Sequence, residues 1–334
     1  MKKFLALLLA AMMVFSLAAC SSSEEPAEEP APSEEPADGT TTYNVGIIQL
    51  VEHPALDAAT QGFKDALTEA LGDSVTFDEN NAQGESANCA TIANSLVSNN
   101  VDLILANATA PLQAAAAATA DIPILGTSIT DFASALDIDG WTGSTGRNIS
   151  GTSDLAPLDG QAQVLNELFP VADYPNVGII YCSAEANSIY QATVITGYLE
   201  EMGYTVSEYT FADSNDIASV VTNACSACDV LYVPTDNTAA NNTSAIDNVA
   251  VPAGVPIVAG EEGICAGCGV ATLSISYYDL GHAAGEMAVK ILAEGADIST
   301  MPVQYAPQFT KEYDAARCEA LGIEVPSDYI AIGE

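Results

Sequence analysis

Short apolar runs alternate with longer amphipathic segments along most of the chain. The first run, Val45 to Leu50, is rich in β-branched residues and predicts a buried strand. Pro54 then stands where a helix would begin. Apolar residues follow it at helical spacing: Ala55, Ala58, Ala59, Phe63, Ala66, Leu67 and Leu71. This strand-to-helix order predicts an α/β protein built on parallel sheets.

The same order of segments occurs twice. Asn44 to Ile48 reads Asn-Val-Gly-Ile-Ile, and so does Asn176 to Ile180, 132 positions later. Two more pairs of strand-like segments keep this order at offsets of 127 and 133: Val101–Leu105 with Cys228–Tyr232, and Ile122–Ile124 with Val255–Ile257. The repetition predicts two similar α/β lobes in one chain.

The chain is expected to cross from one lobe to the other three times. The first crossing is placed at Asn148–Thr152, the second at the helix that begins near Tyr277, and the third after Val303. Lobe one would then comprise residues 41–150 and 278–303, and lobe two residues 151–277 and 304–334. Polar residues follow the strands of both lobes, at the edge where open parallel sheets bind ligands.

The first forty residues have a different composition. Lys2 and Lys3 precede an apolar run that ends in Leu17-Ala18-Ala19-Cys20. This pattern is typical of a secretory signal over residues 1–20 and resembles the bacterial lipoprotein box, whose cysteine carries the lipid. Residues 21–40, rich in Ser, Glu, Pro and Ala, predict a disordered acidic tether. We therefore expect a protein anchored through Cys20 to the extracytoplasmic face of the bacterial membrane.

The formal net charge of −38 excludes a nucleic-acid-binding function, because that requires neutralising phosphates. After signal removal only five basic residues remain: Lys64, Arg147, Lys290, Lys311 and Arg317. A ligand carboxylate would therefore rely on backbone N–H groups, hydroxyls and helix N-termini, or on Arg147.

Two Cys-x-x-Cys pairs, Cys225/Cys228 and Cys265/Cys268, superficially match a four-thiolate zinc site. The 36 residues between the pairs are more than a usual zinc ribbon has, and they read as a complete strand-helix-strand unit. Structural disulfides or free thiols are favoured over zinc, with redox catalysis as a third alternative. We expect no resident metal and no cofactor.

Six motifs in order resemble the substrate-binding lipoproteins of tryptophan-type ABC importers. They are Gln49–Asp57, Asn81–Gly84, Gly151–Asp154, Ser183–Ser188, Pro234–Thr238 and Ala259–Gly263. The resemblance spans about Tyr43 to Gly322, and only the cysteine pairs depart from it. It implies a type I periplasmic-binding-protein fold, with two Rossmann-like lobes joined by a three-strand hinge. It also implies an aromatic or apolar amino acid ligand, an ABC permease as partner, and a monomeric protein.

An amino acid zwitterion needs neighbouring anion and cation sites. The anion site is predicted at the helix start near Ala108 and Thr109, with the Thr127 hydroxyl, because helix N-termini favour negative charge. The cation site is predicted at carboxylates. Asp236 comes first, with Glu185 and Glu261 behind it. Directional hydrogen bonds are assigned to Gln49, Asn187 and Asn237. His53 and an apolar wall near Leu50 are expected to face the ligand side chain, and Glu52 is also assigned to the ligand site.

Each assignment has a structural alternative. Asp236, Asn237 and Thr109 are also typical of helix caps and turns. Glu261 fits a solvated surface charge, and His53 fits a helix-start residue.

Catalysis is disfavoured, because the chain has two histidines and lacks a Gly-x-Ser-x-Gly elbow and a phosphate-binding glycine loop. A lipid-anchored receptor, or a binder of a nucleoside or sugar, remains the alternative to an importer component.

Overall fold

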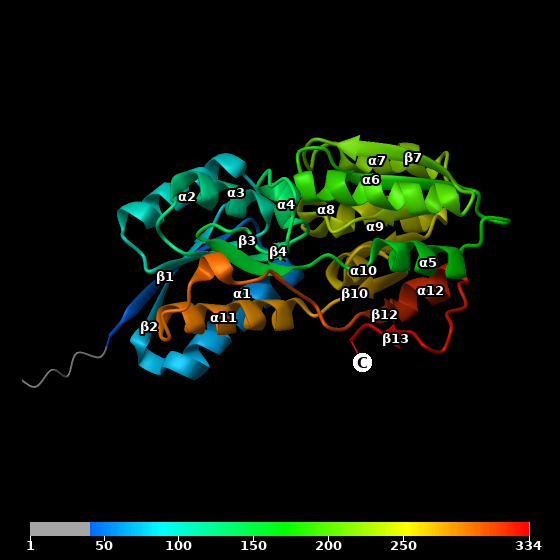
Figure 1. The fold of residues 1–334 in the computed structure, drawn as a ribbon. Helices are drawn as coiled ribbons and strands as arrows, with labels where there is room; N and C mark the ends of the chain where they lie inside the picture. Colours follow the sequence, from blue (N-terminus) through cyan, green and yellow to red (C-terminus); the bar gives the residue numbers. More distant parts are fainter. Residues whose placement is uncertain (1–40, 334) are drawn as a thin grey trace, which may run out of the picture. The chain divides into compact units, whose positions relative to one another are not determined.

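The computed structural model describes residues 41–333, so the predicted signal, Cys20 and the tether lie outside the described residues. Two sheets form the described part (Figure 1). The first has the strand order β11-β5-β4-β3-β1-β2, and all its pairs are parallel. Its strands are β1 (Tyr43–Gln49), β2 (Val75–Asn81), β3 (Leu103–Asn107), β4 (Ile124–Ile129), β5 (Ile149–Ser153) and β11 (Gln304–Tyr305).

The second sheet has the order β13-β12-β10-β9-β8-β6-β7, with one antiparallel pair, β10 with β12. Its strands are β6 (Asn176–Cys182), β7 (Thr205–Phe211), β8 (Val230–Val233), β9 (Ile257–Ala259), β10 (Ala271–Ser274), β12 (Thr310–Tyr313) and β13 (Ile330–Ala331). The core order β7-β6-β8-β9-β10 matches β2-β1-β3-β4-β5 of the first sheet. The two α/β lobes predicted from the repeated sequence are thus confirmed.

Helices cover both faces of each sheet. The first sheet is flanked by α1 (Pro54–Leu71), α2 (Ser86–Ser98), α3 (Thr109–Ala118), α4 (Phe132–Ala135) and α11 (Tyr277–Leu292), with short 3₁₀ turns η1 (Gly72–Ser74) and η2 (Ile298–Thr300). The second is flanked by α5 (Leu158–Leu168), α6 (Ala186–Glu201), α7 (Ile217–Cys225), α8 (Asn237–Ala240), α9 (Thr243–Ala253), α10 (Glu262–Cys268) and α12 (Ala315–Leu321). The predicted start of α1 at Pro54 and the predicted extent of α11 are confirmed.

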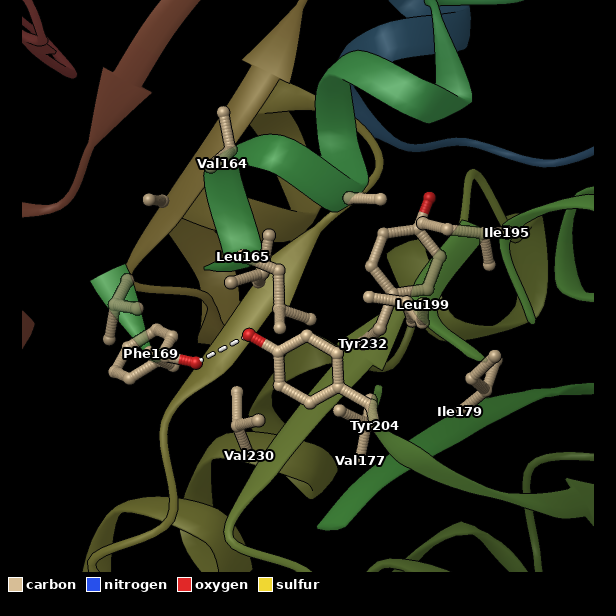
Figure 2. Packing of buried hydrophobic residues seen from close by; sticks show 14 of the residues in the cluster. Val164, Leu165, Phe169, Val177, Ile179, Ile195, Leu199, Tyr204, Val230 and Tyr232 are labelled. Carbon is tan, nitrogen blue, oxygen red and sulfur yellow. Dashed lines mark hydrogen bonds between the residues drawn. The ribbon is translucent and has the colours of Figure 1, made fainter. Parts of the chain in front are cut away.

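Alternation along β1 explains how one strand supports two helical layers. Val45 and Ile47 pack with residues of α1 and α11, whereas Ile48 packs with residues of α2 and α3. Successive side chains of a strand point to opposite faces, so a short apolar run serves both layers. In the second lobe, Figure 2 shows α5 and α6 residues packed over Val177, Val230 and Tyr232, with the Tyr204 hydroxyl donating to the Phe169 carbonyl at 2.7 Å.

Helices α1 and α11 approach each other closely. A Cβ on Gly281 would lie 1.8 Å from the Ala59 carbonyl oxygen, and one on Gly62 would lie 2.1 Å from the Tyr278 carbonyl oxygen. The contact therefore requires glycine at both positions, and it fixes the start of α1 against the start of α11.

The division of the chain into lobes at particular residues stays a prediction. β5 continues through Ser153 in the first sheet, and β11 pairs with β5 at residues 304–305. Helix α11 contacts α1, β4 and β5, so it belongs to the first lobe's packing as expected.

Candidate functional site

The carboxyl ends of the two sheets meet through buried polar contacts. His53, before α1, lies 3.2 Å from Asn237 at the start of α8, measured between Nε2 and Oδ1. Gln191 of α6 donates from Nε2 to the Thr130 hydroxyl at 3.2 Å. Tyr277, which follows the second sheet, donates its hydroxyl to Asp154 Oδ2 at 2.9 Å. The first two contacts join one lobe to the other, and the third holds the segment that leads from the second sheet into α11 against the end of β5.

A cleft of about 520 Å³ opens beside these contacts. Both lobes line it, the first with Leu50, Val51 and the start of α3, the second with the segments that precede α6 and α8. Four residues predicted for the site lie in its wall: Thr109, Glu185, Asn187 and Asn237. A concavity therefore lies between the lobes, and His53, Ser128 and Asp154 are not among the residues that line it.

The three carboxylates predicted to hold an ammonium group have other partners. Asp236 accepts the backbone N–H groups of Ala239 at 2.7 Å and Cys182 at 2.6 Å, so it caps α8 and ties it to β6. Its side chain is buried, and burial raises its pKa to about 7. The capping alternative describes this geometry, and the predicted ammonium contact stays a prediction.

Glu185 and Glu261 follow the same pattern. Glu185 accepts the backbone N–H groups of Asn237 at 3.0 Å and Thr238 at 2.8 Å, together with the side chains of both residues. It also accepts from Asn187 Nδ2 at 3.2 Å. Glu261 caps α10, and burial raises its pKa to about 7. The description of Glu261 as a solvated charge is wrong, since only 2% of it is exposed.

Three other predicted residues lie apart from this meeting point. Gln49 bonds within its own lobe, donating to Val51 O at 2.9 Å and Asp57 Oδ1 at 2.6 Å. Glu52 is exposed and lines a separate surface hollow. Thr127 is buried, and its hydroxyl accepts from that of Thr152 at 3.0 Å. The structure does not bring these three side chains together with those of the second lobe.

The start of α3 has an unusual backbone. Ala108 is the N-cap, with φ 98° and ψ 165°, a conformation that is essentially restricted to glycine. Thr109 is the first residue of the helix, so its interpretation as the N-cap is wrong. No side chain caps α3, and its first turn faces the cleft at Thr109 and Ala110. The predicted anion site therefore has available N–H groups.

Two residues that were not predicted for the site also lie at the strand ends of the first sheet. Asp154, directly after β5, is 5% exposed; one carboxylate oxygen binds Tyr277, and the other, Oδ1, has no hydrogen-bond partner among the described residues. Burial raises the pKa of Asp154 to about 6, although the hydroxyls of Tyr277 and Thr130 lie close enough to the carboxylate to oppose the rise. Ser128 sits in the irregular end of β4 with φ 57°, and its buried hydroxyl likewise lacks a partner there. Asp154 belongs to the motif Gly151–Asp154 of the sequence analysis, whereas Ser128 lies outside the six motifs.

His53 has a defined tautomer. Asn237 Nδ2 donates to Glu185 Oε2 at 2.7 Å, so Asn237 Oδ1 faces His53 and must accept from Nε2–H. Burial lowers the pKa of His53, which keeps the ring neutral. Its Nδ1 is then a buried acceptor, and the described residues offer it no donor.

All seven cysteines in residues 41–333 are free thiols, and six are buried. Burial raises the pKa of Cys89 and Cys318 to about 11, which disfavours thiolate chemistry. Within the same residues, no group of three or more His, Cys, Asp or Glu side chains is placed to hold a metal ion. None of the helices in this part of the chain is long and apolar enough to cross a membrane.

Two lobes of the same topology, meeting at their strand ends around a cleft, define a ligand-binding protein of the type I periplasmic-binding-protein class. Residues 44–331 match the family model for ABC transporter substrate binding proteins. The chain belongs to this family, whose members bind small molecules outside the cytoplasm and work with ABC permeases.

Three similar proteins are informative. A curated tyrosine-binding protein of Clostridioides difficile is 35% identical over 306 residues, covering 90% of this chain and 87% of the relative. The structure of an ABC domain from Streptococcus pneumoniae in complex with L-Trp has 32% identity and a TM-score of 0.81, covering 86% of this chain and 96% of the other. The ligand-free, open structure of a substrate binding protein with adhesive properties from Clostridium difficile has 35% identity but a TM-score of 0.67. The match covers 87% of this chain and 99% of the other.

Proposed function

We propose that this protein binds an aromatic α-amino acid between its lobes and delivers it to an ABC permease. The observation that carries the proposal is the buried, unpartnered Oδ1 of Asp154, which follows β5, one strand from Ser128 and two strands from the start of α3. The similarity to a tyrosine-binding protein and to a tryptophan complex supports the same ligand class.

Strand order explains why these groups suit a zwitterion. β4 lies between β3 and β5, and Ala108 N donates to Thr127 O at 3.1 Å, which sets the start of α3 beside Ser128. Asp154 N donates to Ile129 O at 3.2 Å, which sets Asp154 on the other side of Ser128. The ligand ammonium would bind Asp154 Oδ1. The ligand carboxylate would bind the Ser128 hydroxyl and the N–H groups that begin α3.

No cationic side chain is needed for this arrangement. Arg147, the predicted alternative for the carboxylate, donates to the Leu136 carbonyl at 3.4 Å within the first lobe. The N-terminus of α3 and the Ser128 hydroxyl would bind the ligand carboxylate instead, which agrees with the scarcity of basic residues.

In this proposal the two lobes close around the ligand by a hinge motion. The chain matches the tryptophan complex better than the open structure, although the open protein has the higher identity. The contacts between His53 and Asn237 and between Gln191 and Thr130 would form on closure. Small-angle scattering should show a smaller radius of gyration with ligand; an unchanged radius would argue against closure.

Replacing Asp154 with Asn tests the site. The charged hydrogen bond to the ammonium is lost, so calorimetry should show amino acid binding about 10- to 150-fold weaker. Asp102→Asn is the matched control, because Asp102 is exposed on the first lobe, away from the strand ends, and its carboxylate accepts the Asn44 N–H at 2.7 Å. Unchanged affinity in Asp154→Asn would remove Asp154 from the site.

A thermal-shift screen against the twenty amino acids, nucleosides and sugars tests the ligand class. A ligand that binds the folded state raises the melting temperature by mass action. A rise with tyrosine, tryptophan or phenylalanine is expected. A rise only with nucleosides or sugars would contradict the amino acid assignment and leave the family intact.

Membrane attachment through Cys20 is a further part of the proposal and rests on Leu17-Ala18-Ala19-Cys20 alone. Lipidation would hold the binding lobes at the outer face of the membrane on the tether of residues 21–40. Cys20→Ser should move the protein from the membrane fraction to the soluble fraction. Retention of this variant in the membrane fraction would contradict the lipid anchor.

A further inference from the structure

His53 occupies a part of the binding edge that the zwitterion does not use. In the first sheet the order is β5, β4, β3, β1, and His53 follows β1. Asp154 and Ser128 follow β5 and β4, and the start of α3 follows β3. Two strand spacings separate β1 from β4, which amounts to about 10 Å. An amino acid anchored at the β3–β5 end would therefore extend its side chain toward His53.

Apolar side chains lie between these two ends. Leu50, Val51 and Ala108 belong to one buried hydrophobic cluster, and Leu50 and Val51 also line the cleft. Such a wall suits an aromatic ring. His53 follows Leu50 and Val51 in the chain, and its Nδ1 is a lone pair with no proton and no donor among the described residues. His53 is 7% exposed, so closure of the lobes leaves little access for water.

We propose that His53 Nδ1 accepts a hydrogen bond from the ligand side chain and so selects an aromatic amino acid whose ring carries an O–H or N–H. This inference rests on the proposed function and specifies its ligand. Tyrosine and tryptophan supply such a donor. Phenylalanine fills the same apolar space but leaves Nδ1 buried without a partner, which costs binding free energy.

The test is the ratio of dissociation constants, measured by calorimetry on the purified protein with tyrosine, tryptophan and phenylalanine. Phenylalanine should bind roughly 5- to 150-fold more weakly than the better of the other two. O-methyltyrosine, which keeps the oxygen but lacks its proton, should lose affinity as well. Equal affinity for all three amino acids would overturn the inference and leave the proposed function standing. Binding of none of them would overturn the proposed function itself.

Variants separate recognition from folding. His53→Phe should bring the ratio between phenylalanine and the preferred ligand close to one, whereas His53→Gln, which retains a donor for Asn237 and an acceptor for the ligand, should keep part of the preference. His282→Phe is the matched control, because His282 lies on α11 near Glu69 and Glu286, away from the cleft. Asp154→Asn should weaken binding of all three amino acids equally. A preference that survives in correctly folded His53→Phe would contradict the proposal.

Discussion

The two lobes present polar residues at matching strand ends, but they use them differently. In the second lobe, Asp236, Glu185 and Glu261 all accept backbone N–H groups of helix starts. In the first lobe, four buried atoms near the strand ends lack a partner among the described residues: His53 Nδ1, Asn107 Oδ1, Ser128 Oγ and Asp154 Oδ1. Asp131 caps α4 in that lobe, and the second lobe has two such unpartnered atoms among the described residues, Thr272 Oγ1 and Glu312 Oε2, both within strands. The lobes therefore differ in how many strand-end polar atoms have no partner, and in the proposed function those of the first lobe bind the ligand.

The difference follows from the helices that start at each edge. In the second lobe α8 and α10 are short and begin with acidic N-caps, so each carboxylate is used by its own helix. In the first lobe α3 begins at Ala108, which has no side-chain acceptor. A sheet edge whose polar groups are all hydrogen-bonded within the protein is held rigidly. A sheet edge with donors and acceptors that have no partner can bind a ligand.

The largest expected effect is on the stability of the second lobe. Asp236→Ala removes the cap of α8 and leaves the Cys182 N–H without its partner, so we expect a loss of about 1–3 kcal/mol in the free energy of unfolding. Urea denaturation measures it. Asp154→Asn, at the other lobe's edge, should unfold at the same or a higher urea concentration. Equal losses in both variants would remove the distinction between the edges.

The next effect is a pH dependence: raising the pH should strengthen ligand binding and lower the free energy of unfolding. Burial raises the pKa of Asp154 to about 6. Burial also raises the pKa of its neighbour Tyr277 well above the ordinary value of a tyrosine, so Tyr277 stays protonated. Ammonium binding needs the carboxylate, so affinity should be full above pH 6 and fall roughly tenfold per unit below it.

Stability should change the other way. The folded-state pKa values of Asp154, Asp236 and Glu261 lie above their ordinary values, so the stability they contribute is present at low pH and lost as pH rises through about 6 to 7. Calorimetry and thermal melts between pH 5 and 8 measure both trends. Affinity that stays constant over this range in the wild-type protein would contradict the role of Asp154.

The smallest effect concerns Ser128. Ser128→Ala removes one hydrogen bond to the ligand carboxylate, so affinity should fall by about 0.5–1.5 kcal/mol. The free energy of unfolding should be unchanged or higher, since a buried hydroxyl without a partner is removed. Ser153→Ala is a suitable comparison, because the Ser153 hydroxyl is already bonded to Thr130 O at 3.0 Å. A larger affinity loss in Ser153→Ala would place the carboxylate elsewhere.

Much of the fold could be predicted from the sequence, because short apolar runs and helical spacing are local signals. The repeat of Asn-Val-Gly-Ile-Ile indicated two lobes, and Pro54 marked the start of α1. Polar residues were predicted at the strand ends of both lobes, where they lie, but the hydrogen bonds of their carboxylates could not be predicted. Whether Asp236 is free depends on Cys182, 54 positions away, and the isolation of Asp154 Oδ1 depends on packing around Tyr277, 123 positions away.

The bond between Tyr277 and Asp154 has a pharmacological consequence. Asp154 follows β5, where the chain first leaves the first sheet, and Tyr277 begins α11, where the chain returns to it. In the proposed function, a ligand ammonium on Asp154 would thus act directly on two of the connections between the lobes. An aromatic compound without the ammonium would contact the apolar side chains and leave these connections unaffected. We expect such a compound to compete with the amino acid for binding without favouring the proposed closed form.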